Sequence, residues 1–229
     1  MHEPVLTQHE AVAAYSIQQA IAMTQAAEQK AWKIIKDMAA LLKPGLTEAK
    51  LRELTPDIFA AHGADKAWHQ SYLYFGSHSI TTFRDTKPTE SLSLKENDIV
   101  TLDIGPIFTI EGVQVEGDVG QTFVLGDNPL FHQLKKASEE IFQQARTYWQ
   151  QNQPTGIELY QYIHQLTQQA SFVFHLEPAG HLIGSFPHKG WKEGLSHYPF
   201  IPEPGIWILE VQLRHPTQPY GAFYEAVLA

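Results

Sequence analysis

Cysteine is absent from this sequence of 229 residues. Its absence excludes disulfide bonds and metal sites built on thiolates. It also suits a reducing compartment, so we expect a cytoplasmic protein. The N-terminal stretch lacks the basic flank and apolar run of a signal peptide, and no apolar stretch approaches the length of a membrane-spanning helix. We therefore expect no membrane partner.

Positive charge is also scarce. Lysine and arginine together number 16 against 25 aspartate and glutamate residues, which gives a formal net charge of -9 at pH 7. Nucleic acids and anionic membranes are therefore not expected as partners. Hydrophobic residues make up 43% of the chain, enough for one substantial core, and we expect a single catalytic domain over residues 1–229.

Two pairs of helices are predicted, and a proline divides each pair. The four helices are expected at residues 8–43, 47–62, 128–151 and 155–169. Pro44 stops the first of them. Asn128 before Pro129 is typical of a helix start, and the spacing of Thr155 and Glu158 is that of a capping box.

Strand-like segments follow each helical pair. They lie at residues 71–76, 79–83, 98–105, 113–125, 207–213 and 223–228. The order helix, proline break, helix, strands thus occurs twice, which predicts an internal pseudo-repeat of two α+β halves. A chance likeness between two helical hairpins is the alternative.

Two aspartates lie in or beside apolar strands. Asp103 is flanked by Leu102 and Ile104, and Asp118 comes shortly before the apolar run 123–125. A hairpin turn between them would place both on neighbouring strands. Buried carboxylates are costly unless they are paired, hydrogen-bonded or bound to metal, and facing carboxylates repel unless a positive charge lies between them. The alternative is that Asp103 caps a turn and Asp118 lies in a loop.

Further candidate ligands follow in the second half. His181 and His188 lie in a glycine-containing segment, and glycine permits close approach of the backbone to a site. Glu210 and Glu225 each stand among apolar and aromatic residues of a predicted strand. Four carboxylates and one imidazole suit two divalent metal ions that share bridging carboxylates, with Mn, Fe, Co or Zn as candidates. Such a pair can activate water for hydrolysis.

The order of these residues resembles a known family. In the pita-bread metallopeptidases (methionine aminopeptidase, aminopeptidase P, prolidase and creatinase) the metal ligands occur in the order Asp, Asp, His, Glu, Glu. The matching residues here are Asp103, Asp118, His181, Glu210 and Glu225. The resemblance extends from about residue 30 to the end. It implies an α+β pita-bread fold, in which two pseudo-repeated halves form a curved antiparallel sheet covered by helices.

The resemblance also implies a role for each ligand. Asp103 would bind one metal ion, and His181 and Glu210 would bind the other. Asp118 and Glu225 would bridge the two ions. Glu210 would in addition accept a proton from the nucleophilic water.

The resemblance is less complete around the substrate. His188 takes the place of a family histidine that contacts the substrate and the developing oxyanion, but Lys189 follows it where the family has glutamate. Peptidases of the family carry another histidine ahead of the first ligand. Asp85 occupies that position here, and His78 could substitute for it only if the loop folds back. Val211 replaces a proline, and the gap between the two aspartates is longer than usual.

Three functions are compatible with these residues. A metalloaminopeptidase would remove the N-terminal residue of a short peptide, and the residues after His181 slightly favour Xaa-Pro over Met peptides. A creatinase-like C–N hydrolase or a lyase would act on a small-molecule substrate, and Asp85 is its main support. A non-catalytic binding module is the third, although such a module need not keep all five ligands. The resemblance is also compatible with a homodimer.

Overall fold

The computed structural model describes residues 16–82, 84–175, 179–184, 191 and 193–229. Within them the helices are α1 (Ile17–Ala40), α2 (Glu48–Ala61), η3 (Gly76–Ile80), α3 (Pro129–Asn152), α4 (Gly156–Gln169) and η4 (Leu195–His197), of which η3 and η4 are short 3-10 helices. The strands are β1 (Ala64–Ala67), β2 (Tyr72–Phe75), β3 (Asp98–Ile104), β4 (Pro106–Ile110), β5 (Val113–Glu116), β6 (Val119–Leu125), β7 (Val173–Phe174), β8 (Ile208–Arg214) and β9 (Gly221–Val227).

The helices begin where the sequence offers a cap. The side chain of Thr47 accepts a hydrogen bond from the backbone of α2, and that of Asn128 does so for α3. Thr155 and Glu158 form the predicted capping box at the start of α4. The predicted bounds of these three helices are confirmed to within a residue. Helix α1 ends at Ala40, earlier than predicted, and the predicted residues 8–15 lie outside the described ranges.

The strands form two antiparallel sheets. The larger has the order β2-β3-β6-β9-β8-β7 and the smaller has the order β1-β4-β5. Strands β4 and β5 form a hairpin whose turn residues, Glu111 and Gly112, have positive φ angles of 49° and 81°. Two such residues make the tight turn that matches the twist of a hairpin. This hairpin accounts for the long gap between Asp103 and Asp118, because it is inserted between β3 and β6.

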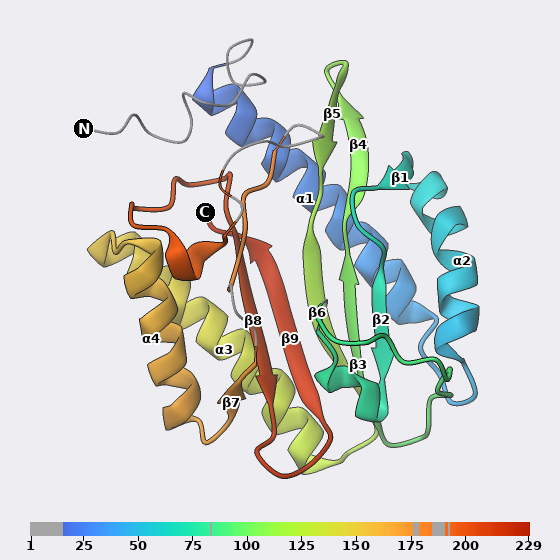
Figure 1. Cartoon of the computed structure of the whole chain (residues 1–229). Coiled ribbons are helices and arrows are strands. Elements are labelled where there is room, and N and C mark those ends of the chain that lie inside the picture. Colours follow the sequence, from blue (N-terminus) through green and yellow to red (C-terminus); the bar gives the residue numbers. More distant parts are fainter. Residues whose placement is uncertain (1–15, 83, 176–178, 185–190, 192) are drawn as a thin grey trace.

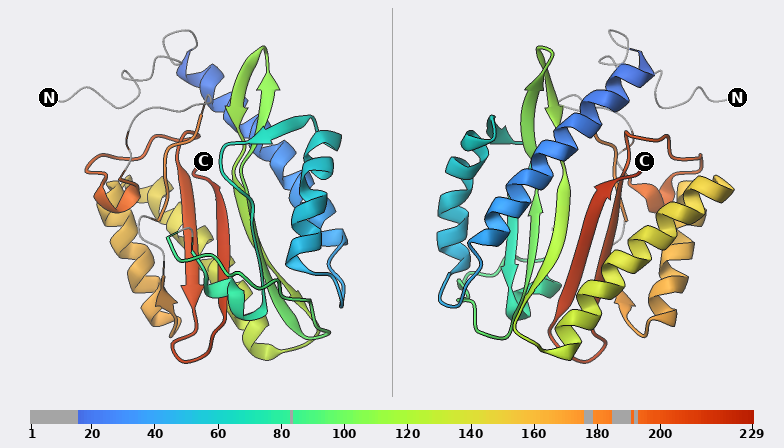
Figure 2. Two further views of the ribbon diagram at one scale, coloured as in Figure 1. Left: turned by 45° about the vertical axis from the view of Figure 1, so that its right-hand side comes forward. Right: turned by 180° about the vertical axis from the view of Figure 1, so that it is seen from behind.

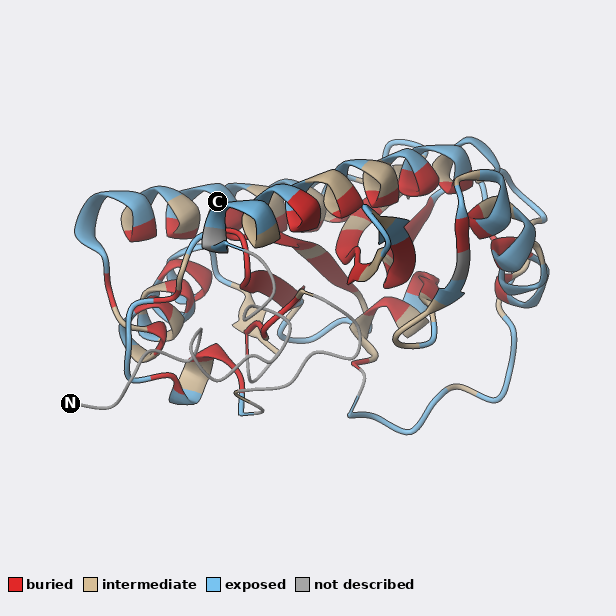
Figure 3. Cartoon of the chain, turned by 90° about the horizontal axis from the view of Figure 1, so that it is seen from above, coloured by how far each residue is buried: buried red, intermediate tan, exposed pale blue. Residues whose placement is uncertain are grey.

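The four α-helices lie on one side of the larger sheet. Helices α1 and α3 cross its rear face, and α2 and α4 flank it near its two edges (Figures 1 and 2). Their outer residues are exposed and their inner residues are buried (Figure 3). In α1 the buried positions Ala27, Ala31, Ile34 and Met38 recur at intervals of three and four, which is the pattern of a helix packed on one face. In the described ranges, no helix has both the length and the apolar character needed to cross a bilayer.

The two halves repeat one another closely. Helices α1 and α3 each have 24 residues, and α2 and α4 each have 14. Each half has its own hydrophobic core, one around Leu73 and Val100 and the other around Trp207 and Leu209. Pairing of β6 with β9 joins the halves at the centre of the sheet. The predicted architecture of two α+β halves, with helices covering an antiparallel sheet, is therefore confirmed.

Two strand predictions were wrong in detail. Residues 79–83 were expected to form a strand, but Ser79 and Ile80 lie in η3, residues 81 and 82 lie in no strand, and residue 83 lies outside the described ranges. Helix η3 is tied down by Ser79, whose Oγ accepts a hydrogen bond from the backbone nitrogen of Gly221 at 2.9 Å. Residues 113–125 form two strands rather than one, because the chain leaves the small sheet after Glu116 and enters the large sheet at Val119.

Candidate metal centre

Four acidic side chains gather where the two halves meet. Asp103 lies on β3, Glu210 on β8 and Glu225 on β9, and Asp118 directly precedes β6. The strand register brings them together, because Asp103 pairs with Gly120, Gly120 with Glu225, and Glu225 with Glu210. The structure thus unites all four carboxylates that the sequence singled out.

Glycine is required at the centre of this arrangement. A Cβ atom on Gly120 would lie 2.3 Å from Cε1 of Phe223 and 3.2 Å from Oε2 of Glu225. Any side chain there would push against the carboxylate of the neighbouring strand. The absence of a side chain on β6 therefore leaves room for the carboxylates to converge.

His181 faces three of these carboxylates. Its Nε2 atom lies 3.0 Å from Oδ2 of Asp118, 3.4 Å from Oε1 of Glu210 and 3.6 Å from Oε1 of Glu225. Its Nδ1 atom lies 2.8 Å from the backbone oxygen of Leu182, which can only accept a hydrogen bond. The ring is therefore oriented so that Nδ1 donates to the backbone and Nε2 is directed at the acids.

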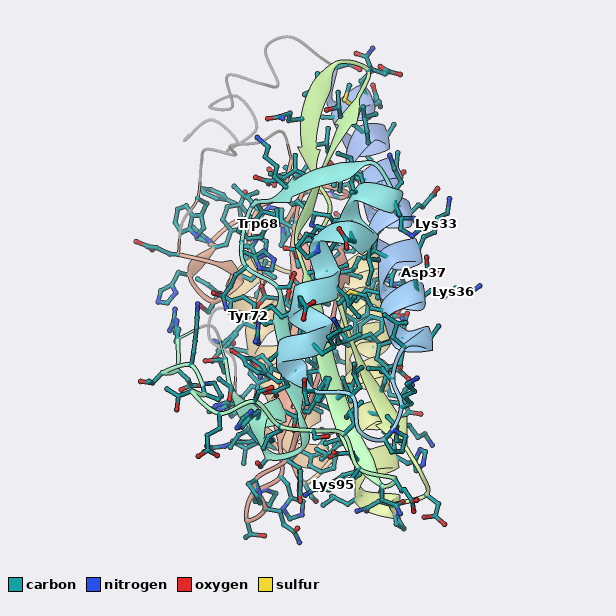
Figure 4. All side chains as sticks on the ribbon, turned by 90° about the vertical axis from the view of Figure 1, so that its right-hand side faces the viewer. Lys33, Lys36, Asp37, Trp68, Tyr72 and Lys95 are labelled. Carbon is teal, nitrogen blue, oxygen red and sulfur yellow. The ribbon has the colours of Figure 1, made fainter. Side chains whose placement is uncertain are left out.

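A second imidazole, which the sequence reasoning missed, lies on the other side of Asp118. Nε2 of His69 lies 3.3 Å from Oδ1 of Asp118 and 3.6 Å from Oδ1 of Asp103, and its side chain is 14% exposed. The neighbouring residues Trp68 and Tyr72 lie on the opposite side of the sheet from α1 (Figure 4). Its neighbours in the sequence give no signal, because its place beside Asp103 depends on the pairing of β2, the strand that follows it, with β3.

The oxygen atoms of this cluster fit bound cations. Asp103 Oδ1 and Asp118 Oδ2 are buried and have no partner in hydrogen-bond geometry among the residues with defined positions. The second of these atoms is close to His181 Nε2 but not aligned with it as an acceptor. Two sets of side chains each present ligand atoms within 4.8 Å of one another, namely His69, Asp103 and Asp118, and Asp118, His181 and Glu225. Buried oxygens without donors are costly, and a divalent cation would satisfy them.

Burial and crowding perturb the acids. Burial, followed by the charge of Glu225, raises the pKa of Asp103 well above its ordinary value. Burial, followed by the charge of Asp118, does the same for Glu225. Burial raises the pKa of Glu210 to about 7, although the nearby His181 opposes this. Three of the four acids thus tend to hold protons when no other cation is present.

Asp118 behaves in the opposite way. Burial raises its pKa, but the imidazoles of His181 and His69 outweigh burial and hold the pKa below its ordinary value. The same contacts act on the imidazoles. Burial lowers the pKa of His69, but the charge of Asp103 and the contact with Asp118 outweigh it and raise that pKa to about 9. Asp118 is thus the carboxylate between two positively charged groups.

Two other predicted site residues are engaged elsewhere. Nδ1 of His78 lies 3.0 Å from Oε1 of Glu48 at the start of α2. Asp85 accepts a hydrogen bond from the backbone nitrogen of Thr82 at 2.7 Å, and its Oδ2 lies 3.9 Å from Nε2 of His175. Neither group has a contact with the carboxylate cluster in the described part of the chain. The place beside Asp103 and Asp118 is taken by the imidazole of His69.

Three further residues differ from the family pattern or were assigned from it, namely His188, Lys189 and Val211. His188 and Lys189 lie outside the described residues, so the role of His188 stays a prediction. Val211 is buried within β8 and pairs with Tyr224 of β9. It belongs to the second core, which explains why an apolar residue is suited to that position.

A cavity of about 590 Å³ adjoins the cluster on the side of α2. His69 and Tyr74 are among its lining residues, and the hydroxyl group of Tyr74 is buried without a hydrogen-bond partner in the described part of the chain. Three cationic side chains also line it, namely Arg52, Lys66 and Lys87, together with the carboxylates of Glu48 and Glu90. The cavity therefore offers several donors to an acidic group close to the cluster.

Metal binding to this cluster is expected to release protons and to strengthen as the pH rises. Ligands must be deprotonated, whereas the raised pKa of Glu210, about 7, and of His69, about 9, leave both groups protonated below those values. Each displaced proton should weaken the affinity about tenfold for every pH unit below the pKa. Calorimetric titration with Zn²⁺ at pH 6, 7 and 8, in buffers of different ionisation heat, measures both effects. An affinity that is constant across this range would contradict the prediction.

The sequence and the fold of this chain are similar to those of known proteins. Residues 16–224 match the profile of metallopeptidase family M24. The fold is similar to that of the prolidase from Pyrococcus horikoshii OT3, with 16% identity and a TM-score of 0.74 over 91% of this chain and 58% of that one. It is also similar to the X-Pro aminopeptidase from Thermotoga maritima MSB8, with 14% identity and a TM-score of 0.74 over 92% of this chain and 61% of that one.

A third similar structure is a variant of Escherichia coli aminopeptidase P, with 16% identity and a TM-score of 0.72 over 91% of this chain and 52% of that one. The chain thus spans between about half and two thirds of the length of these proteins. No curated protein sequence matches it. Likeness at this identity shows the fold, whereas the family profile covers most of the sequence, and the chain therefore belongs to metallopeptidase family M24.

Proposed function

We propose that the protein is a two-metal hydrolase that removes the N-terminal residue of a short peptide, with Xaa-Pro peptides slightly preferred over Met peptides. The observation that carries this proposal is the convergence of four carboxylates and two imidazoles, with two buried carboxylate oxygens that have no partner in hydrogen-bond geometry in the described chain. A structural ion-pair cluster would use its donors to satisfy such oxygens. Membership of the metallopeptidase family supports the same conclusion.

Five of these side chains would hold the cations. Asp103 would bind one ion, His181 and Glu210 the other, and Asp118 and Glu225 both. When bound, divalent cations polarise a carbonyl group and make water a stronger acid. The chain's own part is to fix the ligands, which it does with paired strands and with the hydrogen bond from Nδ1 of His181 to the backbone.

Glu210 is the residue we propose for proton transfer. Its side chain is 9% exposed, and its pKa is raised to about 7. That pKa belongs to the metal-free cluster, so the proposal rests on the place of the carboxylate among the metal ligands, 3.4 Å from Nε2 of His181, where it can accept a proton from water and return it. Glu210 would take the proton of the attacking water and deliver it to the leaving amine. His188 is proposed to donate to the oxyanion that develops on the peptide carbonyl.

Peptide hydrolysis by the metal-loaded protein tests this proposal. We expect release of free amino acid from Xaa-Pro and Met-Ala peptides, and a Glu210→Gln variant should lower kcat by about 10²–10⁴-fold because it cannot accept a proton. Glu203→Gln is the matched control, since Glu203 is a partly buried carboxylate bound instead by Tyr198 and Trp207. A wild type that binds metal but leaves every peptide intact would refute the peptidase proposal.

A second candidate function is the hydrolysis or elimination of a small acidic C–N compound. The cavity beside His69 favours it, because its three cationic side chains outnumber its two carboxylates in a chain of net charge -9. Small amidine-bearing carboxylic acids therefore belong in the same substrate panel. Turnover of such an acid by a protein inert to peptides would establish this second function. Metal binding without any turnover would indicate a binding protein.

A further inference from the structure

His69 occupies a position in the first half of the chain that is equivalent to the position of His181 in the second half. Strand β2, which follows His69, pairs with β3 on the side away from β6, and Tyr72 lies opposite Asp103. The backbone nitrogen of Trp68 donates to Gly105 at 3.0 Å, so the chain before β2 also runs alongside β3. His69 therefore lies on the segment that borders β3.

The second half of the chain shows the same arrangement. The backbone nitrogen of Ile208 donates to His181 at 2.8 Å, and that of Glu210 donates to Ala179 at 3.2 Å, so this segment borders β8. It lies on the side of β8 away from β9. Each half thus contributes one acid from β3 or β8, one acid at the central pair of strands, and one histidine from the bordering segment.

The ring orientation of His69 is that of a ligand. Its Nδ1 lies 2.7 Å from the backbone oxygen of Gln70, which only accepts hydrogen bonds. Nδ1 therefore donates, and Nε2 faces Asp118 and Asp103. His181 has the same arrangement, with Nδ1 on the backbone oxygen of the residue that follows it. An imidazole held in this way presents Nε2 to a metal ion.

The packing around His69 fixes this orientation. The ring of Trp68 lies edge-on at 4.5 Å, and the ring of Tyr72 is stacked at 5.5 Å. A Cβ atom on Gly105 would lie only 2.3 Å from Cδ2 of His69. The imidazole therefore fills a space bounded on three sides, and it faces the oxygen atom of Asp118 that His181 does not approach most closely.

We propose that His69 is a sixth metal ligand, which binds the ion held by Asp103 and Asp118 as His181 binds the other. This inference rests on the proposed two-metal site and adds a residue that the Asp, Asp, His, Glu, Glu pattern does not contain. Each ion would then have one imidazole. A nitrogen ligand in the site formed by Asp103 and Asp118 should shift the preference of that site from Mn²⁺ toward Zn²⁺ and Co²⁺.

Titration of the metal-free full-length chain with Co²⁺, followed by calorimetry and visible absorption, tests the assignment without any measurement of turnover. We expect two binding steps in the wild type. His69→Gln should weaken one step by at least about 10–100-fold and leave the other, whereas His181→Gln should weaken the step that His69→Gln spares. His62→Gln is the control, because His62 is a partly buried imidazole that pairs with Asp37 instead.

X-ray absorption of the zinc-loaded wild type provides a second measurement that needs no variant. It should show about one imidazole per zinc, whereas ligation by His181 alone would give about one half. The lower value, or two unchanged steps in His69→Gln, would overturn the inference. Peptide hydrolysis is assayed on the same samples. A protein with one imidazole per zinc but no hydrolysis would refute the proposed function and retain His69 as a ligand.

Discussion

Replacement of Asp118 by asparagine is expected to lower the affinity for divalent metal by more than about 100-fold and to remove metal-dependent hydrolysis. Loss of a residue that only orients a ligand already costs about 10–100-fold, and Asp118 would be shared by both ions. Its side chain is 1% exposed and lies between His69 and His181, so the isosteric change removes a charge from the centre of the cluster. Calorimetric titration with Zn²⁺ measures the loss.

The metal-free fold should change little in Asp118→Asn. The charge of Asp118 raises the pKa of Glu225, so its removal relieves crowding while it weakens the contacts to two imidazoles. The thermal midpoint of the metal-free variant should therefore stay near that of the wild type, and the rise of the midpoint on metal addition should disappear. Unchanged metal affinity in this variant would contradict the proposed bridging role.

Asp98→Asn is the matched control for this experiment. Asp98 is also buried and lies on β3, which pairs with the strand that follows Asp118, but its oxygens accept hydrogen bonds from the backbone nitrogens of Lys95 and Ile99, each at 3.1 Å. An asparagine keeps only one acceptor oxygen, so the variant should lose about 1–3 kcal/mol of stability. Its metal affinity should equal that of the wild type. The two aspartates thus separate the effect of burial from the effect of metal binding.

The carboxylate cluster could be predicted because its members stand out locally. Asp103, Glu210 and Glu225 each lie within an apolar strand, where an unpaired charge is costly, and this anomaly is visible without knowledge of any partner. The helices were predictable for a similar reason, since caps such as Thr155 act within one turn. Features that depend on neighbours in the sequence can be read from the sequence.

His69 could not be identified in this way. Its neighbours Trp68 and Gln70 carry no pattern of their own, and the two acids that its ring faces, Asp103 and Asp118, are 34 and 49 residues further along the chain. Its place beside Asp103 depends on the register of β2 with β3, which is set by long-range pairing. Family spacing instead pointed to Asp85, because spacing cannot show which segment of an inserted loop returns to the site. The same dependence on distant contacts explains why residues 79–83 were assigned to a strand.

Gly180→Ala is expected to destabilise the protein by roughly 2–5 kcal/mol and to weaken metal binding, because overpacking and backbone strain act together. Gly180 has a φ angle of +140°, and a Cβ atom there would lie 2.1 Å from the backbone oxygen of Ile208. It would also lie 2.6 Å from Cδ1 of Leu195. The side chain cannot be accommodated unless the segment moves away from β8, and His181 is the next residue. The sequence suggested that glycine here permits close approach of the backbone to a site, and the structure shows a close approach to the backbone of β8 at Ile208.

Gly184→Ala is the control, because it lies on the same segment and a Cβ atom there would meet nothing within 4 Å. For a chain of this size, a loss of 2–5 kcal/mol corresponds to a fall in Tm of roughly 4–20 °C. Gly184→Ala should leave Tm and metal affinity unchanged. Equal behaviour of the two variants would mean that the segment carrying His181 is not held tightly against β8. A fall in Tm without loss of metal affinity in Gly180→Ala would mean that the imidazole reaches its ligand position even when the backbone beside β8 is displaced.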